Sequence, residues 1–155
     1  MEIIKHRINT IAEVKATDPQ YGVEIDIRSQ GQDLIIHHDP YEAGTRLTDW
    51  LAHYRHGTLI LNVKEEGLEK RLSEMMSAHE ITNYFFLDQS IPFLLKTAKS
   101  GERRCAVRWS EYESIETLKM IAPLIDWVWI DCFSKFPITA DNVAEIQHLG
   151  LKTCL

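Results

Sequence analysis

Short apolar runs alternate with amphipathic segments along most of the chain. The apolar runs are rich in Val, Ile, Leu, Phe and Trp, which is typical of buried strands, whereas the segments between them carry apolar residues at helical spacing. The pattern predicts strands at residues 2–7, 22–28, 33–36, 58–64, 83–88, 104–109, 126–131 and 151–155, and helices at residues 10–18, 46–55, 68–79, 91–100, 115–122 and 139–149.

This order of elements predicts a parallel sheet covered by helices. Strands that are apolar on both faces occur mainly in parallel sheets, and the strand–helix unit recurs about every 20–25 residues, as consecutive βα units do. Residues 22–36 differ, because Val23, Ile25 and Ile27 alternate with polar residues and a turn containing Gly31 follows them. At 155 residues we expect one domain, spanning residues 1–155.

Polar side chains follow almost every predicted parallel strand. The carboxyl ends of such strands form the edge at which α/β proteins place their active sites. A single polar residue at a strand end is usually only solvated, but a cluster after nearly every strand indicates a site. The set is His6, Arg7, Glu24, Asp26, Arg28, His38, Asn62, Lys64, Asp88, Arg108 and Asp131.

A TIM-type (β/α) barrel fits this pattern better than a doubly wound sheet. No glycine-rich phosphate loop follows the first strand, which ends in His6-Arg7 instead. About seven parallel strand positions are present, whereas a full barrel has eight and usually needs more than about 200 residues. We therefore expect a barrel that is incomplete at its C-terminus, in a truncated chain that lacks the eighth βα unit. The open seam would allow pairing with a second copy.

Charge and cysteine usage limit the partners and the compartment. The net charge of −6 argues against a nucleic-acid partner, since binding a phosphate backbone requires a basic surface. Cys105, Cys132 and Cys154 lie in apolar runs, so we expect buried free thiols of a reducing compartment. No apolar segment has the length of a signal sequence or a membrane span. These features predict a cytoplasmic protein without membrane insertion.

The segment from Gly22 to Asp39 carries the clearest candidate chemistry. Glu24 and Asp26 lie on the same face of a strand, and His37 and His38 end the next apolar run. Two carboxylates beside an imidazole can bind a hard cation next to an acid–base group. The alternative is a hairpin whose polar face is merely solvated.

Taken in order, these residues resemble a known enzyme family. His6-Arg7, Glu24-x-Asp26, His38-Asp39-Pro40 and an apolar strand ending in Lys64 are similar to the motifs of the glycerophosphodiester phosphodiesterases. That family belongs to the phospholipase-C-like phosphodiesterase superfamily of TIM barrels. The motifs cover residues 3–64, and the remainder of the chain matches only in its order of βα units.

The resemblance implies a metal-dependent hydrolysis of a small phosphodiester, such as a glycerophosphodiester, to glycerol phosphate and an alcohol. It makes His6 and His38 the general acid and base. It assigns Mg²⁺ or Ca²⁺ to Glu24 and Asp26, and the phosphate to Arg7 and Lys64. Asn62 stands where the family usually has a third metal-binding carboxylate, and Ile8 replaces a glycine. An amide oxygen still ligates a hard cation but adds no charge.

Two other interpretations remain open from the sequence. One is a non-catalytic relative of the same fold that binds a phosphorylated metabolite, which Asn62 favours. The other is an unrelated α/β protein in which the motifs occur by chance. Binding of a divalent cation distinguishes the enzyme from the chance match.

Overall fold

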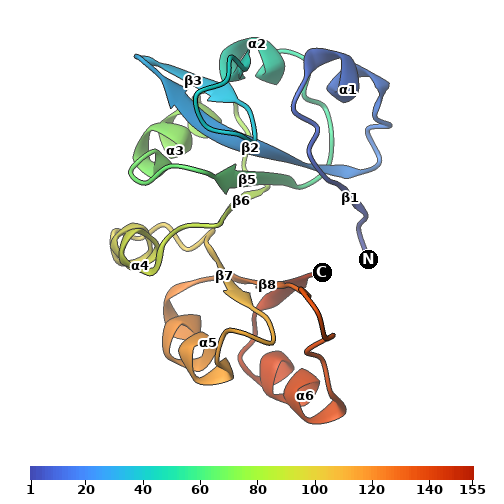
Figure 1. Ribbon diagram of the computed structural model, residues 1–155, viewed down its shortest axis with the longest axis vertical. Coiled ribbons are helices and arrows are strands. Elements are labelled where there is room, and N and C mark those ends of the chain that lie inside the picture. The colour runs from blue at the N-terminus through green and yellow to red at the C-terminus, as the bar shows by residue number, and fades with distance from the viewer. The chain divides into compact units, whose positions relative to one another are not determined.

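The computed structural model describes all of residues 1–155, and it consists of two compact units. The first comprises Met1–Gln89 and the second Ser90–Leu155. Figure 1 labels the elements of both, and each unit is described by itself.

The first unit is built on a sheet of six strands. Strand β2 (Gly22–Gln30) is its centre: it pairs in parallel with β5 (Leu59–Val63) on one edge, and β5 pairs in parallel with β6 (Tyr84–Leu87). Along its other edge, the start of β2 pairs in parallel with β1 (Ile4–Lys5) and its end pairs with the antiparallel strand β3 (Asp33–Ile36). The short strand β4 (Thr45–Arg46) borders β3. This arrangement puts the residues that follow β1, β3 and β5 around the carboxyl-terminal half of β2.

Two short helices of this unit, α1 (Ile11–Ala16) and α2 (Leu47–Leu51), pack against each other above β2 (Figure 1). Helix α1 begins at a capping box, in which the Thr10 hydroxyl accepts from the Glu13 backbone and the Glu13 carboxylate accepts from the Thr10 backbone at 2.9 Å. The indole of Trp50 is fully buried and donates to the carbonyl of Ile8 at 2.9 Å. Helix α2 is thereby fixed to the segment between β1 and α1. Helix α3 (Glu69–Ala78) connects β5 with β6 and buries Leu72 and Met76.

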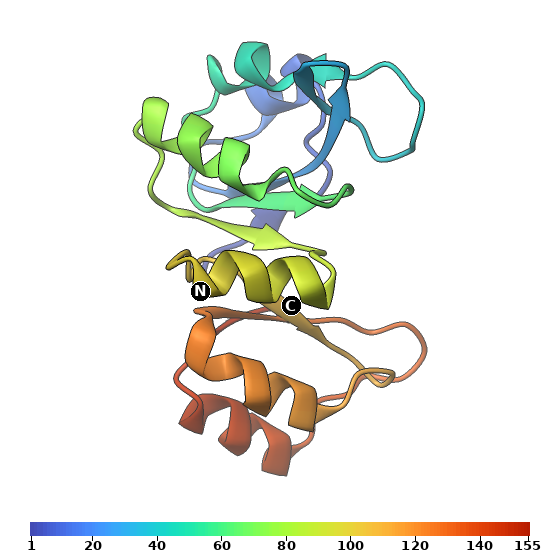
Figure 2. The ribbon, with the colours of Figure 1, turned by 90° about the vertical axis from the view of Figure 1, so that its left-hand side faces the viewer.

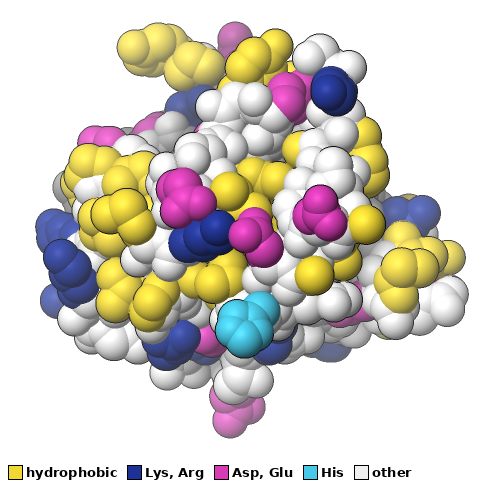
Figure 3. Space-filling view, turned by 90° about the horizontal axis from the view of Figure 1, so that it is seen from below, with side chains coloured by type: hydrophobic (Ala, Val, Ile, Leu, Met, Phe, Trp, Pro, Cys, Tyr) yellow, Lys and Arg dark blue, Asp and Glu magenta, His cyan; other side chains and the backbone are white.

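The second unit contains a parallel sheet of three strands, in the order β7 (Ala106–Trp109), β8 (Trp127–Ile130) and β9 (Lys152–Cys154). Its helices are α4 (Ile91–Lys99), α5 (Ile115–Ile121) and α6 (Ala140–His148), with a 3₁₀ turn at Ala122–Leu124. Figures 1 and 2 show α5 beside α6, and Lys119 bridges them through Glu145 at 2.9 Å. On the face drawn in Figure 3, acidic, basic and hydrophobic side chains are interspersed, so charge of one sign forms no continuous patch there.

The predicted α/β class is confirmed, and strands occur at all seven expected parallel positions. The predicted incomplete (β/α) barrel is not confirmed, because the strands form two separate sheets and neither sheet closes on itself. That the chain is one barrel domain stays a prediction. No helix combines the length with the apolar composition that crossing a membrane requires.

Three local predictions were wrong. The first strand covers only Ile4–Lys5, because the backbone turns at Arg7, and β4 was not foreseen. Helix α2 is shorter than residues 46–55, since after Leu51 the backbone tightens into turns in which His53 donates to the carbonyl of Trp50 and Tyr54 to that of Leu51. None of the three cysteines forms a disulfide, as predicted. Only Cys105 is buried, however, and Cys132 is exposed because it lies beyond the end of β8.

Candidate functional site

The centre of the candidate site is a pair of buried carboxylates on β2. Glu24 and Asp26 point to the same face of the strand and are both 0% exposed. Asn62 lies directly opposite Asp26 on the neighbouring strand β5, and its Nδ2 donates to Glu24 Oε1 at 2.8 Å. The register of two parallel strands thus brings the three predicted metal ligands together.

The segment after β1 reaches this pair from the other edge of β2. The backbone N–H of Arg7 donates to Glu24 Oε2 at 2.7 Å, and His6 Nε2 lies 3.4 Å from the same oxygen. Arg7 has a φ of 57°, a left-handed conformation that few residues other than glycine adopt. This turn aims the Arg7 N–H at the carboxylate and places His6 beside it, so both predicted residues belong to the site.

Asn9 is a site residue that the sequence did not indicate. Its Nδ2 donates to Asp26 Oδ2 at 2.8 Å, and its Oδ1 accepts from the backbone N–H of Asp26 at 3.0 Å. One amide therefore fixes both the side chain and the backbone of Asp26. The neighbouring capping residue, Thr10, marks the start of a helix in the sequence, but nothing there shows that the preceding asparagine faces β2.

Lys64 closes the site at the carboxyl end of β5. Its ammonium lies 3.4 Å from Asp26 Oδ1 and 3.2 Å from Asp88 Oδ2 at the end of β6. Asp88, like Arg7, has a left-handed backbone, with a φ of 62°. The predicted phosphate-binding lysine is thus held between two carboxylates, one of which is fully buried.

His38 lies on the far side of Arg7 from Glu24. Arg7 Nη2 is 3.0 Å from His38 Nε2, and His38 Nδ1 is 2.8 Å from Asp39 Oδ1. A guanidinium has only donors, so Nε2 accepts and the ring proton is assigned to Nδ1, which donates to Asp39. The neutral imidazole is therefore oriented from both sides.

Arg28 connects the His38 turn to the end of β5. Its guanidinium donates to the carbonyl of His38 at 2.8 and 3.1 Å and to the carbonyl of Lys64 at 3.4 Å. The sequence placed Arg28 among the polar residues at strand ends but did not give it this role. All seven predicted site residues lie in the first unit and are linked by these contacts.

The electrostatics of the site follow from burial. Desolvation, and after it the charge of Asp26, raises the pKa of Glu24, although the N–H donors from Arg7 and Asn62 act in the opposite direction. The hydrogen bond from His38 lowers the pKa of the exposed Asp39. A positive charge beside Glu24 and Asp26 would relieve their mutual repulsion.

The donor atoms present fit a hard cation, although no group of three His, Cys, Asp or Glu side chains is arranged to hold a metal. Asp26 Oδ1 and Asn62 Oδ1 are buried and accept no hydrogen bond, the former facing only the ammonium of Lys64. Two carboxylates and one amide oxygen form the all-oxygen set that Mg²⁺ and Ca²⁺ prefer. The third of the predicted ligands is an amide, so these residues do not count as a group of three acidic side chains.

Comparisons with known proteins support the fold. No protein-family model and no curated protein matches the chain. Among solved structures, the chain is similar to the crystal structure of a glycerophosphodiester phosphodiesterase from Agrobacterium tumefaciens strain C58. The two share 14% sequence identity and superpose with a TM-score of 0.71 over 99% of this chain and 84% of the other. At this identity the likeness establishes a shared α/β fold.

Proposed function

We propose that the protein hydrolyses a phosphodiester, specifically a glycerophosphodiester to glycerol phosphate and an alcohol. One observation carries this proposal: two imidazoles, two cationic side chains and two buried carboxylates, taken from four separate segments of chain, converge in one network, in which Arg28 joins the segments of His38 and Lys64. The fold shared with a phosphodiesterase supports it. The proposal includes an incomplete (β/α) barrel as the full architecture of the chain.

Arg7 and Lys64 would bind the substrate phosphate. A phosphate oxygen is a stronger acceptor for a guanidinium than a neutral imidazole is. The substrate would therefore take the guanidinium from His38 Nε2, while the backbone N–H of Arg7 stays on Glu24. Lys64 would add a second positive charge from the end of β5. Together they would offset the charge that builds up on the phosphoryl oxygens in the transition state.

His38 and His6 would move the protons. Once Arg7 turns to the phosphate, His38 Nε2 is an unprotonated nitrogen held in orientation by Asp39, which is what a general base requires. His6, on the opposite side of Arg7, would donate a proton to the leaving alcohol oxygen. Because one imidazole must be neutral and the other charged, we expect a bell-shaped dependence of rate on pH.

Glu24, Asp26 and Asn62 would hold Mg²⁺ or Ca²⁺. Such an ion supplies Lewis-acid polarisation of a phosphoryl oxygen when bound. The protein's part would be to keep the ligands in place: the donors from Arg7 and Asn9 hold the carboxylates of Glu24 and Asp26, and the bond from Asn62 to Glu24 orients the amide.

A second candidate function is binding of a phosphorylated metabolite without catalysis. It is favoured by the hydrogen bond from Asn62 to Glu24. This amide donor stabilises the Glu24 carboxylate without a cation, which a catalytic metal ion would otherwise do. In that case Arg7 and Lys64 would bind the phosphate, and the two histidines would transfer no proton.

The test is hydrolysis of glycerophosphocholine and bis-p-nitrophenyl phosphate with added Mg²⁺ or Ca²⁺. We expect His6→Ala and His38→Ala each to lower kcat by about 10²- to 10⁴-fold, the usual contribution of a positioned proton-transfer group. His79→Ala is the matched control, since His79 is exposed at the end of α3. Phosphate-ester binding without turnover in the wild type would favour the second candidate. Equal residual activity in all three variants would refute the assigned site.

A further inference from the structure

The ammonium group of Lys64 lies against an oxygen that belongs to the candidate metal site. Its Nζ is 3.4 Å from Asp26 Oδ1, which is buried and accepts no hydrogen bond. The other oxygen of the same carboxylate accepts from Asn9 at 2.8 Å. In this arrangement Lys64 supplies the positive charge that offsets the buried Asp26 carboxylate.

Asp88 gives the same ammonium a second carboxylate. Strands β5 and β6 pair with Asn62 opposite Leu87, so the residue that follows β6 lies beside the end of β5. Asp88 is that residue, and its Oδ2 is 3.2 Å from Lys64 Nζ. The Lys64 and Asp88 side chains are only 17% and 21% exposed, so solvent screens this ion pair weakly.

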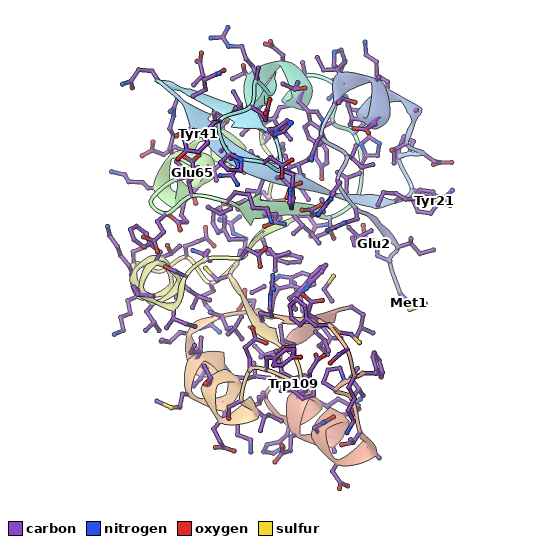
Figure 4. All side chains as sticks on the ribbon, viewed as in Figure 1. Met1, Glu2, Tyr21, Tyr41, Glu65 and Trp109 are labelled. Atoms are coloured by element: carbon purple, nitrogen blue, oxygen red, sulfur yellow. The ribbon has the colours of Figure 1, made fainter.

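The acidic residue next to Lys64 is engaged elsewhere. Figure 4 labels this residue, Glu65, just beyond the end of β5. Its Oε2 accepts from the backbone and the hydroxyl of Ser29 at 3.1 and 2.5 Å, and its Oε1 lies 3.7 Å from Arg28 Nη1. Lys64 therefore divides its contacts between two carboxylates, the fully buried Asp26 and the partly exposed Asp88.

From this geometry we infer that Lys64 competes with a divalent cation for Asp26, and that Asp88 is the positioning residue that keeps the ammonium when the cation binds. Both positive groups need the same carboxylate oxygen, and like charges held this close repel each other. Cation binding therefore removes the contact from Lys64 to Asp26, whereas the contact to Asp88 remains. This inference rests on the metal site of the proposed function.

The exchange would also prepare Lys64 for the substrate. An ammonium group has three N–H donors and no acceptor. The contact with Asp88 holds the side chain near the site, and the donor that leaves Asp26 becomes available to a phosphate oxygen. Asp88 would thus link the two halves of the site, since it keeps the phosphate-binding lysine in place while the cation takes Asp26.

The experiment is a double-mutant cycle on the affinity of the full chain for Mg²⁺ and, separately, for Ca²⁺, measured by calorimetry. Lys64→Met removes the competing charge and should tighten cation binding by about 3- to 30-fold, a usual coupling within one charged network. Asp88→Asn should weaken cation binding by about the same factor, because Lys64 then stays on Asp26. Combined with Lys64→Met, Asp88→Asn should change the affinity by about twofold or less.

A second measurement follows Lys64 directly. In spectra of the lysine ammonium groups, Mg²⁺ should shift the Lys64 signal and leave that of Lys70, whose side chain is 91% exposed, in place. Lys70→Met and Asp33→Asn make the same charge changes at more exposed positions of this unit. These controls should alter the affinity by about twofold or less, since distant exposed charges are screened. Lys64→Gln also removes the charge and replaces Lys64→Met if that variant does not fold.

The outcomes separate this inference from the proposed hydrolysis. Weaker or unchanged cation binding in Lys64→Met, or an equal effect of Asp88→Asn with and without Lys64, would overturn the inference even if phosphodiesters are hydrolysed. A lack of cation binding in every variant would overturn it together with the metal site. The expected cycle would support it even if glycerophosphocholine is not hydrolysed, because the calorimetry uses no substrate.

Discussion

The guanidinium of Arg7 donates to Nε2 of His38 across 3.0 Å, which fixes the proton of this imidazole on the other ring nitrogen. We predict that the neutral His38 imidazole is the Nδ1–H tautomer. Arg7→Met removes the donor to Nε2 but keeps Asp39 as the acceptor from Nδ1–H, so the Nδ1–H tautomer should remain the major form, and a mixture of tautomers should appear only when Asp39 is replaced by Ala as well. Long-range ¹H–¹⁵N spectra of the histidine side chains measure this. Arg46→Met removes an exposed arginine paired with Asp33 and should leave the His38 signals unchanged.

Asn62 determines how strongly the site attracts a cation. Asn62→Asp should tighten Mg²⁺ or Ca²⁺ binding by about tenfold or more, because it adds a negative charge to the ligand set. Without metal the same variant should unfold more easily by about 1–3 kcal/mol, since Glu24 Oε1 loses its donor. Calorimetry measures the affinity, and urea unfolding with and without the cation measures the stability.

Asn83→Asp serves as the control for this charge change, because Asn83 precedes β6, at the opposite end of the sheet from the site. If Asn62→Asp and Asn83→Asp change metal affinity equally, the effect is one of net charge and Asn62 is not a ligand.

Glu24 should make the protein less stable as the pH rises. Burial and Asp26 raise its pKa above the ordinary 4.5, so the folded state favours the protonated form. Its contribution to stability is fully present below pH 4.5 and is lost as the pH rises through the raised pKa. Relative to the wild type, Glu24→Gln should thus become more stable as the pH rises from acidic to neutral. The same variant should not bind the metal. Urea unfolding across this range measures the gain; a constant difference between the two proteins would contradict the assignment.

Glu111 should make the protein more stable as the pH rises. Its desolvation opposes ionisation, but the backbone N–H groups of Lys135, Ser134 and Phe133 donate to the carboxylate and lower its pKa to about 2. This contribution to stability is present above pH 4.5 and is lost as the pH falls towards 2. Glu111→Gln should therefore differ most from the wild type near neutral pH and converge with it in acid. As a control, the stability of Glu74→Gln, a change at an exposed position, should depend on pH in the same way as that of the wild type.

The sequence predicted the strands, and the grouping of polar candidates at their carboxyl ends, because both depend on regular spacing. Alternation at period two placed Glu24 and Asp26 on one face, and apolar runs located the strands whose ends carry His6 and Lys64. The contacts between segments were not predictable in this way. Asn9 reaches Asp26 only because β1 pairs with the start of β2, and Arg28 reaches His38 only because β3 folds back on β2. Such pairings depend on tertiary register, which one sequence does not specify.

The boundaries that failed also depend on tertiary contacts. The residues of the predicted helix 46–55 have helical spacing, yet α2 ends at Leu51, and the Tyr54 hydroxyl that follows donates to the carbonyl of Gly57. A helix this short has little stability of its own, so contacts with the following loop decide where it ends. The separation of the strands into two sheets likewise has no signal in the order of strands and helices.

The left-handed backbone at Arg7 and Asp88 has a consequence for laboratory evolution. Glycine would relax each of these positions by about 1–2 kcal/mol but would remove the side chain. A library selected only for expression or thermal resistance should therefore drift to glycine there, whereas one selected for turnover should keep the original residues. Glu80, which is also left-handed but only ends α3, should drift in both. Comparing the residues enriched in the two selections would show at which positions a strained backbone is kept because its side chain is needed for turnover.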